Sequence, residues 1–401
     1  MKKQEKWIKK RHAIATELAR AVLTPVARRK YGVKPERFKE QGDRAYLVLY
    51  NHQTPFDQFF VGLSFSGPVY YVATEDIFSK GFVSSLLRFL VAPIPIVKST
   101  TDLKAVKTCI RVAKEGGTIA IAPEGNRTYS GKTEHINPAI AGLARKLGLP
   151  IALYRIEGGY GVQPRWSDKT RRGGMRCYVS RVIEPEEFSG MTNDELFSEI
   201  SAGLFIDDCR SPGTYRSARR AEYLERAIYW CPYCGLSSFE SGGNEIECTR
   251  CRRRIVYGED KRLTGVGFDF PYGTVAEWYD AQSAFVTSLD LSAYTEQPMY
   301  ADTADLYEVV LNKRKKRIAK AAALRLYGDR VEIGTDEPIV LRFSELRAAA
   351  VLGRNKLNLY AGDKTYQIKG GKRFNALKYV NLYYRSKNID RGDVNGKFLG
   401  L

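Results

Sequence analysis

A short apolar run that ends in a histidine-containing block is the feature that most constrains this chain. The run Tyr46-Leu47-Val48-Leu49-Tyr50 predicts a buried strand, and the block Asn51-His52-Gln53-Thr54-Pro55-Phe56-Asp57 follows at its end. Proteins of the α/β class commonly place their chemistry at strand ends. A carboxylate that reaches one imidazole nitrogen fixes the tautomer and leaves the other nitrogen free to accept a proton. We therefore predict His52 as a general base and Asp57 as its orienting partner.

A plainer interpretation of this block is a loop histidine followed by an aspartate that favours a helix N-terminus. Only three histidines occur in 401 residues, and a second apolar run, 119–122, also ends in a polar loop, Glu124-Gly125-Asn126-Arg127. Arginine suits phosphate because its planar guanidinium offers paired donors. The alternative for this loop is a surface turn with an ion pair worth about 0–1 kcal/mol.

Two further apolar runs complete a set of four predicted strands. Residues 91–98 end in the cation Lys98, and residues 149–155 begin with Leu149-Pro150. Polar residues thus lie just beyond the end of each predicted strand.

Over roughly residues 40–210 the chain resembles the glycerolipid acyltransferases of the lysophosphatidic-acid acyltransferase type. That family has an N-H-x4-D block, a strand ending in a cation, an E-G-T-R block and a fourth strand that starts with proline. Asn51 to Asp57 match the first block, and Glu124 to Arg127 match the third with Asn126 in place of threonine. Lys98 stands where the family normally has arginine, which keeps the charge but loses the bidentate geometry.

The resemblance implies an α/β acyltransferase core and a role in phospholipid biosynthesis. A fatty acyl group would move from acyl-CoA or acyl-ACP to a hydroxyl of lysophosphatidic acid, with His52 as base and Asp57 orienting it. Lys98 and Arg127 would hold the acceptor phosphate, while Glu124, Gly125 and Asn126 would shape the acceptor site. The alternatives are glycerol-3-phosphate or another lysophospholipid as acceptor, or a lipid- or nucleic-acid-binding module without catalysis.

The charge of the chain indicates a polyanionic partner, since the formal net charge is +19. Residues 1–30 hold ten cations and two acids, with apolar residues at helical spacing and a tryptophan at position 7. They predict a basic amphipathic helix at a membrane interface, or else a helix that simply packs on the core. The apolar segment 81–90 predicts a helix that dips into lipid, lines an acyl tunnel or belongs to the core.

No uncharged apolar run approaches the ~20 residues that a membrane-spanning helix needs, and residues 1–30 lack the continuous apolar stretch of a signal peptide. We therefore expect a cytoplasmic protein that is peripheral or monotopic on the inner face of the membrane. Anionic lipid and an acyl thioester donor, with acyl carrier protein as one possible carrier, are the expected partners; nucleic acid is not.

Four cysteines form two C-x2-C pairs separated by 13 residues, namely Cys231, Cys234, Cys248 and Cys251. Two such pairs predict a tetrahedral structural metal site, with zinc favoured and iron as the alternative. The tetrapeptide Cys-Pro-Tyr-Cys also occurs at glutaredoxin active sites, but a redox motif needs no second pair. Arg250 and residues 252–254 keep nucleic-acid binding open as a second interpretation. Cys109, Cys177 and Cys209 are predicted as core or incidental thiols.

The C-terminal third predicts a β-rich domain closed by a helix. Short alternating runs at 322–327, 330–333, 339–343, 348–352, 356–360 and 364–368 are separated by Gly- and Asp-containing turns, and residues 374–384 predict the helix. The pattern resembles a pleckstrin-homology or GRAM-type barrel. The basic run 313–317 would contact lipid headgroups, or form a solvated turn.

Together these features predict five regions. They are a basic amphipathic helix at 1–30, the acyltransferase domain at 31–225, the zinc ribbon at 226–258, a linker with one helix at 259–300, and the β-rich PH/GRAM-like domain at 301–401.

Overall fold

The computed structural model describes residues 6–74, 82–96, 102–309 and 315–400. Two compact units make up the chain. The first contains Met1–Arg165 and Thr170–Tyr215, and the second contains Trp166–Lys169 and Arg216–Leu401. Each unit has its own sheet structure and is described in turn.

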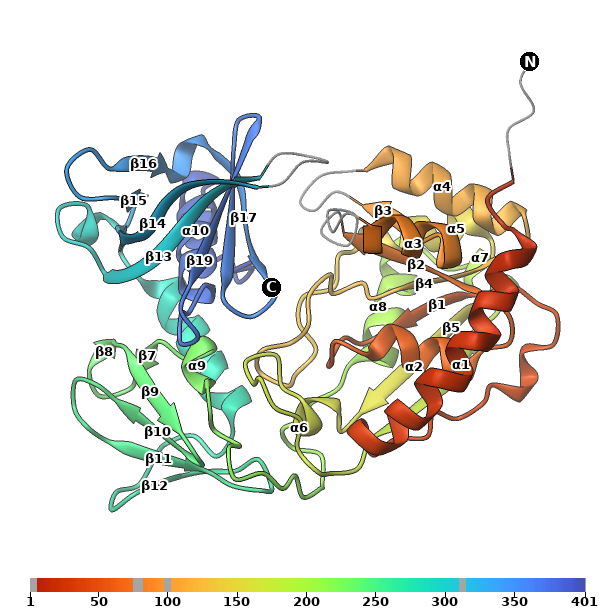
Figure 1. Cartoon of the computed structure of the whole chain (residues 1–401), viewed down its shortest axis with the longest axis horizontal. Coiled ribbons are helices and arrows are strands. Elements are labelled where there is room, and N and C mark those ends of the chain that lie inside the picture. The colour runs from red at the N-terminus through yellow and green to blue at the C-terminus, as the bar shows by residue number, and fades with distance from the viewer. Residues whose placement is uncertain (1–5, 75–81, 97–101, 310–314, 401) are drawn as a thin grey trace. The chain divides into compact units, whose positions relative to one another are not determined.

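A six-stranded sheet forms the centre of the first unit (Figure 1), with strand order β3-β2-β4-β1-β5-β6. Five strands run parallel and β6 runs antiparallel to β5. The strands are β1 (Leu47–Tyr50), β2 (Val69–Thr74), β3 (Ile94–Ile96), β4 (Thr118–Ile121), β5 (Ile151–Glu157) and β6 (Arg176–Ile183). Each of the four apolar runs singled out in the sequence of this unit overlaps one of these strands.

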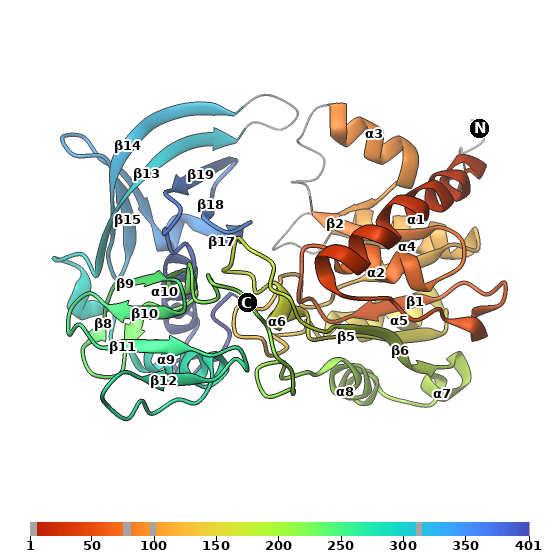
Figure 2. The ribbon, with the colours of Figure 1, turned by 60° about the horizontal axis from the view of Figure 1, so that its bottom comes forward.

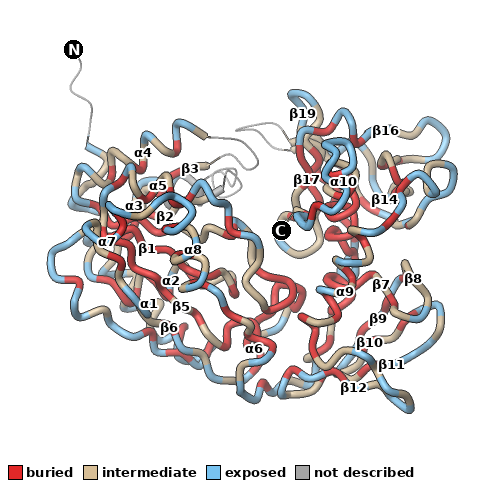
Figure 3. Tube along the Cα trace, turned by 180° about the vertical axis from the view of Figure 1, so that it is seen from behind, coloured by how far each residue is buried: buried red, intermediate tan, exposed pale blue. Residues whose placement is uncertain are grey.

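Successive residues of β1 point into two different cores. Leu47 and Leu49 belong to one buried cluster, and Val48 and Tyr50 belong to the other. This alternation buries the sheet on both faces, which explains why β1 is apolar at every position. Figure 3 shows β1 as buried along its length.

Helices cover both faces of this sheet. The first core includes side chains of α4 (Leu103–Lys114), α5 (Ala139–Leu147), α7 (Pro185–Ser189) and α8 (Asn193–Leu204). The second core includes side chains of α1 (Lys10–Tyr31) and α2 (Asp57–Ser64). Figure 2 shows α1 and α8 on opposite sides of the sheet. The arrangement is the α/β architecture that the sequence predicted.

The N-terminal segment divides between core and surface. Trp7 and Ile8 precede α1 and pack against the first core, and the indole Nε1 of Trp7 donates to the carbonyl of Ala92 at 3.2 Å. Ile14, Leu18 and Val22 of α1 are instead 64, 67 and 65% exposed. The apolar residues of this segment therefore do not form one packed stripe.

The helix predicted at 81–90 is α3 (Phe82–Val91), which contacts α1. Leu86 and Phe89 of α3 are 43 and 54% exposed. Arg11 of α1 donates to the carbonyl of Phe89 and lies over its ring, 4.1 Å from the centroid. Among the described residues, no helix is both long enough and apolar enough to cross a membrane.

The second unit begins with a cysteine-bearing β-ribbon. β7 (Trp230–Cys231) and β8 (Gly235–Leu236) form a small hairpin, and a four-stranded antiparallel sheet has the order β12-β11-β10-β9. Its strands are β9 (Phe239–Gly242), β10 (Glu245–Cys248), β11 (Arg254–Tyr257) and β12 (Leu263–Gly265).

The segment 259–300, expected as a linker, contains β12 and the helix α9 (Val275–Ser288). Thr274 caps α9, because its side chain accepts a hydrogen bond from the backbone of Glu277. Trp278 and Gln282 of α9 are fully buried. Gln282 accepts from the backbone of Tyr229 at 2.7 Å, which ties the helix to the ribbon.

The remainder of the second unit is a seven-stranded antiparallel sheet and a helix. The strand order is β16-β15-β14-β13-β19-β18-β17. The strands are β13 (Tyr300–Val309), β14 (Lys316–Leu326), β15 (Arg330–Ile333), β16 (Ile339–Arg342), β17 (Leu346–Leu352), β18 (Lys356–Ala361) and β19 (Lys364–Gly370). The helix is α10 (Leu377–Asp390), so a β-rich region closed by a helix is confirmed.

Candidate active site

Two loops leave the same edge of the first unit's sheet and are bonded to each other. β1 and β4 are neighbouring parallel strands, with Leu49 opposite Ile121. Parallel neighbours end at one edge, so the loops after them lie together. The backbone N–H of Thr128 in the second loop donates to the carbonyl of His52 in the first at 3.0 Å.

The carboxylate of Asp57 organises the first loop. Its Oδ2 atom lies 2.8 Å from Nδ1 of His52 and accepts the backbone N–H groups of Gln53 at 2.6 Å and Thr54 at 2.8 Å. Its Oδ1 atom accepts the hydroxyl of Thr54 at 2.6 Å. Asp57 is completely buried at the first position of α2, where a negative charge is favoured by the helix dipole.

This arrangement fixes the tautomer of His52. An ionised carboxylate only accepts hydrogen bonds, so Nδ1 of His52 carries the proton that faces Asp57. The lone pair of the neutral ring is then on Nε2, for which the described residues supply no hydrogen-bond partner. The side chain is 21% exposed. His52 can therefore accept a proton from a bound molecule through Nε2.

The surroundings of His52 favour its neutral form. Burial lowers the pKa of His52 below its usual value, whereas the hydrogen bond and the negative charge of Asp57 raise it. The positive charges of Arg127 and Arg165 lower the pKa further. The net effect is a lowered pKa, so the ring is neutral at neutral pH and its Nε2 is free of a proton.

Glu124 connects the two loops through backbone groups. Its Oε1 atom accepts the N–H of His52 at 2.7 Å, and its Oε2 atom accepts the N–H of Glu134 at 2.8 Å. Burial raises the pKa of Glu124 to about 8, although the two backbone donors oppose the shift. Glu124 was predicted to shape the acceptor site. In the structure both of its carboxyl oxygens bind backbone N–H groups and so join the two loops.

The other residues predicted for the acceptor site in the second loop are Gly125, Asn126 and Arg127, which follow Glu124. Gly125 has φ of +67° and its N–H donates to the carbonyl of Ala122, so the turn uses a conformation that favours glycine. Asn126 and Arg127 are half-buried, and Arg127 is close enough to affect the pKa of His52. Lys98 lies outside the described residues.

Sequence reasoning missed a polar network behind the second loop. The hydroxyls of Thr128 and Ser130 donate to Oε1 of Glu134 at 3.0 and 3.2 Å. Arg165 donates through Nη1 to the carbonyl of Arg127 at 2.8 Å. One signal was present: Arg165 is the single charged residue in the stretch 158–167. Nothing in the local sequence marks Glu134.

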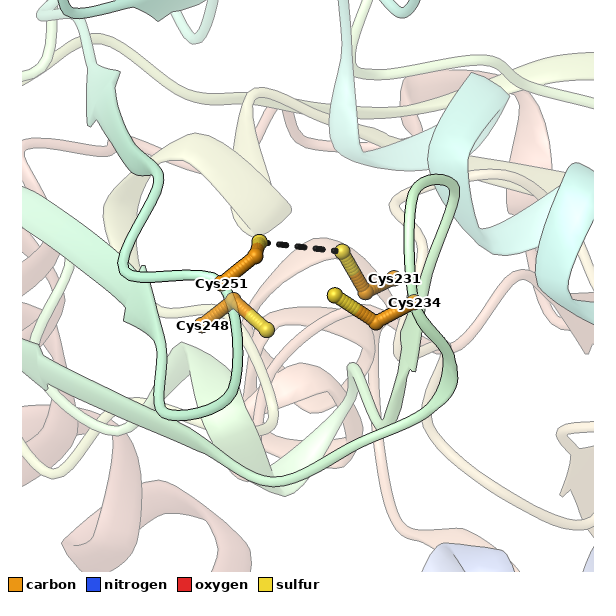
Figure 4. A group of neighbouring side chains, drawn as sticks. All are labelled: Cys231, Cys234, Cys248 and Cys251. Atoms are coloured by element: carbon orange, nitrogen blue, oxygen red, sulfur yellow. Dashed lines mark hydrogen bonds between the residues drawn. The ribbon is translucent and has the colours of Figure 1, made fainter.

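The four cysteines of the second unit come together, as Figure 4 shows. Their sulfur atoms all lie within 4.8 Å of one another, and the Sγ atoms of Cys231 and Cys251 are 3.8 Å apart. A tetrahedral zinc site with zinc–sulfur bonds of about 2.3 Å has sulfur–sulfur edges of about 3.8 Å. The donor set and its spacing therefore fit a tetrahedral metal ion.

The arginines beside the fourth cysteine have partners within the ribbon. Arg252 pairs with Glu247 at 2.8 Å, and Arg254 lies 3.4 Å from Glu245. Arg250 donates to the carbonyl of Cys234 at 2.9 Å. Arg253 lies over the ring of Tyr233, 4.2 Å from its centroid. These contacts favour a structural role for the cluster over a phosphate-binding one.

The first unit is similar to known proteins. Residues 32–156 match the family model described as Acyltransferase. Residues 32–156 form an acyltransferase domain. The match contains both bonded loops and both residues of the His52–Asp57 pair, so the predicted acyltransferase resemblance is confirmed over this part of the chain. It does not extend to the cysteine cluster or the C-terminal sheet.

The search of solved structures found a similarity to the crystal structure of the 1-acyl-sn-glycerophosphate (LPA) acyltransferase PlsC from Thermotoga maritima. The sequence identity is 21%, the match covers 47% of this chain and 76% of that chain, and the TM-score is 0.41. The search of curated proteins gave no match.

The environment of His52 leads to a prediction about its titration. With ¹³C-labelled histidine, the His52 signal, assigned by its loss in His52→Ala, should have an NMR titration midpoint below the usual value of about 6.5. In Asp57→Asn the midpoint should fall further, because the carboxylate raises the pKa of His52. A midpoint above the usual value in the parent, or an upward shift in Asp57→Asn, would contradict the described geometry.

Proposed function

We propose that this acyltransferase domain moves a fatty acyl group from acyl-CoA or acyl-ACP to a hydroxyl of lysophosphatidic acid. The observation that carries the proposal is the buried Asp57 carboxylate bonded to Nδ1 of His52 at the edge where β1 and β4 end. Such a pair presents a neutral Nε2 that can remove a proton from an alcohol.

The reaction is a direct transfer. Nε2 of His52 takes the hydroxyl proton as the acceptor oxygen forms a bond to the thioester carbon. The carbon–sulfur bond then breaks as the tetrahedral oxyanion collapses. The proton passes from His52 to the leaving thiolate, so the base is regenerated. Neither a covalent acyl-enzyme nor a metal ion is needed for these steps.

General base catalysis typically contributes ~10²–10⁴-fold to a rate. The remainder must come from positioning of the two substrates and from stabilisation of the oxyanion. We assign the acceptor phosphate to Arg127, which follows the turn at Gly125 and lies close enough to influence His52. Lys98 is proposed as the second phosphate contact. A phosphate held by Arg127 would bring the acceptor to the same edge of the sheet as the base.

The experiment that tests this function compares acyl transfer by the parent and by two variants. Purified protein is incubated with acyl-CoA or acyl-ACP and 1-acyl-glycerol-3-phosphate in detergent with anionic lipid, and free thiol and phosphatidic acid are measured. His52→Ala and Asp57→Asn should reduce the rate by about 10²–10⁴-fold. His135→Ala is the matched control, because this histidine is exposed and lies outside the His52–Asp57 pair.

The outcomes separate the possible acceptors. Product from glycerol-3-phosphate or another lysophospholipid alone would replace lysophosphatidic acid as the substrate. If every acceptor and both donors give no transfer, the enzymatic proposal fails and a binding module without catalysis takes its place.

We also propose that α1 and α3 form the surface with which the first unit contacts a membrane. Ile14, Leu18 and Val22 recur every four residues and are each about two-thirds exposed, and Leu86 and Phe89 of the adjoining α3 are also exposed. Cations precede and end α1, with Arg28, Arg29 and Lys30 in its last turn. An apolar stripe bordered by cations suits an anionic bilayer surface.

This surface predicts the effect of one inserted charge. Leu18→Glu should weaken sedimentation with phosphatidylglycerol-containing vesicles by about 10- to 100-fold, because burial of a leucine side chain is worth about 1.5–3 kcal/mol. Phe205→Glu is the control, since Phe205 is 49% exposed beside α8 on the opposite side of the sheet. Equal effects of the two substitutions would contradict the proposed contact surface.

For the second unit we propose a structural zinc ion held by Cys231, Cys234, Cys248 and Cys251. The arrangement of sulfur atoms supports this assignment, and a short ribbon gains much of its stability from such a metal. The antiparallel sheet closed by α10 supports the PH/GRAM-like assignment and a role in binding lipid or protein. Lys313 and Arg314 lie outside the described residues, whereas Lys315 donates to Gln367 at 2.6 Å.

The zinc proposal predicts a metal content and a loss of stability. The purified chain should contain one zinc ion by elemental mass spectrometry, and Cys248→Ser should lose the ion and unfold at lower temperature. Cys109→Ser should keep the zinc, because Cys109 is a buried thiol of the first unit. A red protein with iron absorption would contradict zinc, and a metal-free protein of unchanged stability would contradict a metal site altogether.

A further inference from the structure

Arg165 is a buried cation with contacts to the centre of the second active-site loop. It lies beyond the short helix α6 (Gly159–Val162) in a stretch that is buried from residue 158 to residue 167. The residue itself is 3% exposed. Arginine is seldom buried so fully unless its donors are used and its charge is compensated.

Two contacts direct Arg165 toward residues 127–129. Nη1 donates to the carbonyl of Arg127 at 2.8 Å. The guanidinium carbon lies 4.3 Å from the centroid of the Tyr129 ring, and Tyr129 is buried. A guanidinium that both stacks on an aromatic ring and donates to a carbonyl is held in a defined orientation. Arg165 thus fixes the backbone of the residue assigned to the acceptor phosphate.

Glu134 bonds the same loop. Burial raises the pKa of its carboxyl, although the hydroxyls of Thr128 and Ser130 and the charge of Arg165 oppose the shift. Glu134 accepts the hydroxyls of Thr128 and Ser130, and its backbone N–H donates to Glu124. The loop from 124 to 134 is therefore held both by the Glu134 carboxyl and by the Arg165 guanidinium.

The same loop holds the backbone of the base. Glu124 accepts the N–H of His52, and Thr128 donates to the carbonyl of His52. A displacement at Arg127 would reach His52 through these two bonds. Misplacement by 1 Å can reduce a rate by about 100-fold.

We propose that Arg165 is a positioning residue of the active site, which holds the backbone at Arg127 so that the phosphate-binding guanidinium and the base His52 keep one fixed geometry. The proposal rests on the proposed acyl transfer for its kinetic consequences. It concerns a residue that contacts the loop rather than the substrate, in a segment outside the blocks that the sequence resemblance singled out.

The charge of Arg165 should also affect the pKa of His52 and therefore the pH dependence of activity. The groups that face His52 are Asp57 from its own loop, Tyr50 from β1 with ring centroids 6.0 Å apart, Glu124 and Arg127 from the second loop, and Arg165. Of these, Asp57 raises the pKa of His52 and the two arginines lower it. Loss of the Arg165 charge should therefore raise the pKa of His52, and activity should be lost at a higher pH as the solution is acidified.

The test uses two substitutions that separate charge from hydrogen bonding. Arg165→Gln removes the charge, and Arg165→Lys keeps the charge but loses the planar donor group. For Arg165→Gln we expect the KM for the acceptor to rise by about 10- to 100-fold, and the acid limb of the pH–rate profile to move upward by about half a unit, less than the 1–3 units of a directly contacting charge. Arg165→Lys should raise the KM and leave the acid limb in place.

Arg145→Gln is the matched control. Arg145 of α5 also donates to a backbone carbonyl, that of Met191, and to Asn193, and among the described residues its hydrogen bonds do not involve either active-site loop. This substitution should leave the acceptor KM and the acid limb unchanged. Thermal unfolding of all variants is measured alongside, so that a general loss of stability is recognised.

The outcomes distinguish this inference from the proposed function. An unchanged KM and acid limb in a folded Arg165→Gln variant would overturn the inference, as would a loss of kcat alone with lowered thermal stability. If the parent transfers no acyl group, NMR titration of His52 still tests the inference. A higher His52 pKa in Arg165→Gln, but not in Arg165→Lys, would support the placement of Arg165 and confine the failure to the proposed reaction. An unchanged His52 pKa in Arg165→Gln would overturn the inference.

Discussion

The pairing of β1 with β4 is the constraint on which the first unit's site depends. These strands are distant in sequence, yet their parallel pairing brings residues 51–57 and 124–128 to one edge of the sheet. The loops are then joined through main-chain groups, because both the N–H and the carbonyl of His52 bond to the second loop. The backbone of His52 is therefore held in place whichever side chains the outer surfaces of the loops carry.

Several parts of this arrangement were predictable from local sequence. The runs at 46–50 and 119–122 are apolar at nearly every position because both faces of their strands are buried. The spacing of His52 and Asp57 places the aspartate at the first turn of α2, where its carboxylate reaches back to the ring. In the second unit, the pairs of cysteines identified the cluster, because each C-x2-C segment forms one tight turn.

Other parts depend on contacts that no local pattern records. Arg165 and Glu134 meet residues 127–130 only after the chain has folded. β13 was not among the predicted strands, since Asp302, Asp305 and Glu308 interrupt its apolar pattern. Asp302 nevertheless accepts a hydrogen bond from Tyr379 of α10, and Asp305 accepts the backbone N–H of Ala321 in β14. The predicted closing helix began at 374, whereas α10 begins at Leu377 because Asn375 accepts the N–H of Lys378 before the first turn.

The contacts that hold α1 on the first unit affect how the protein would bind a lipid surface. Polar contacts hold the chain before the exposed stripe and within it: Glu115 accepts the backbone N–H groups of Trp7 and Ile8, and Arg20 donates to the carbonyl of Phe65. The helix is thus formed before any encounter, and adsorption carries no cost of ordering a disordered segment. If the proposed membrane contact and acyl transfer hold, turnover would scale with the surface density of acceptor molecules around a docked enzyme rather than with their bulk concentration.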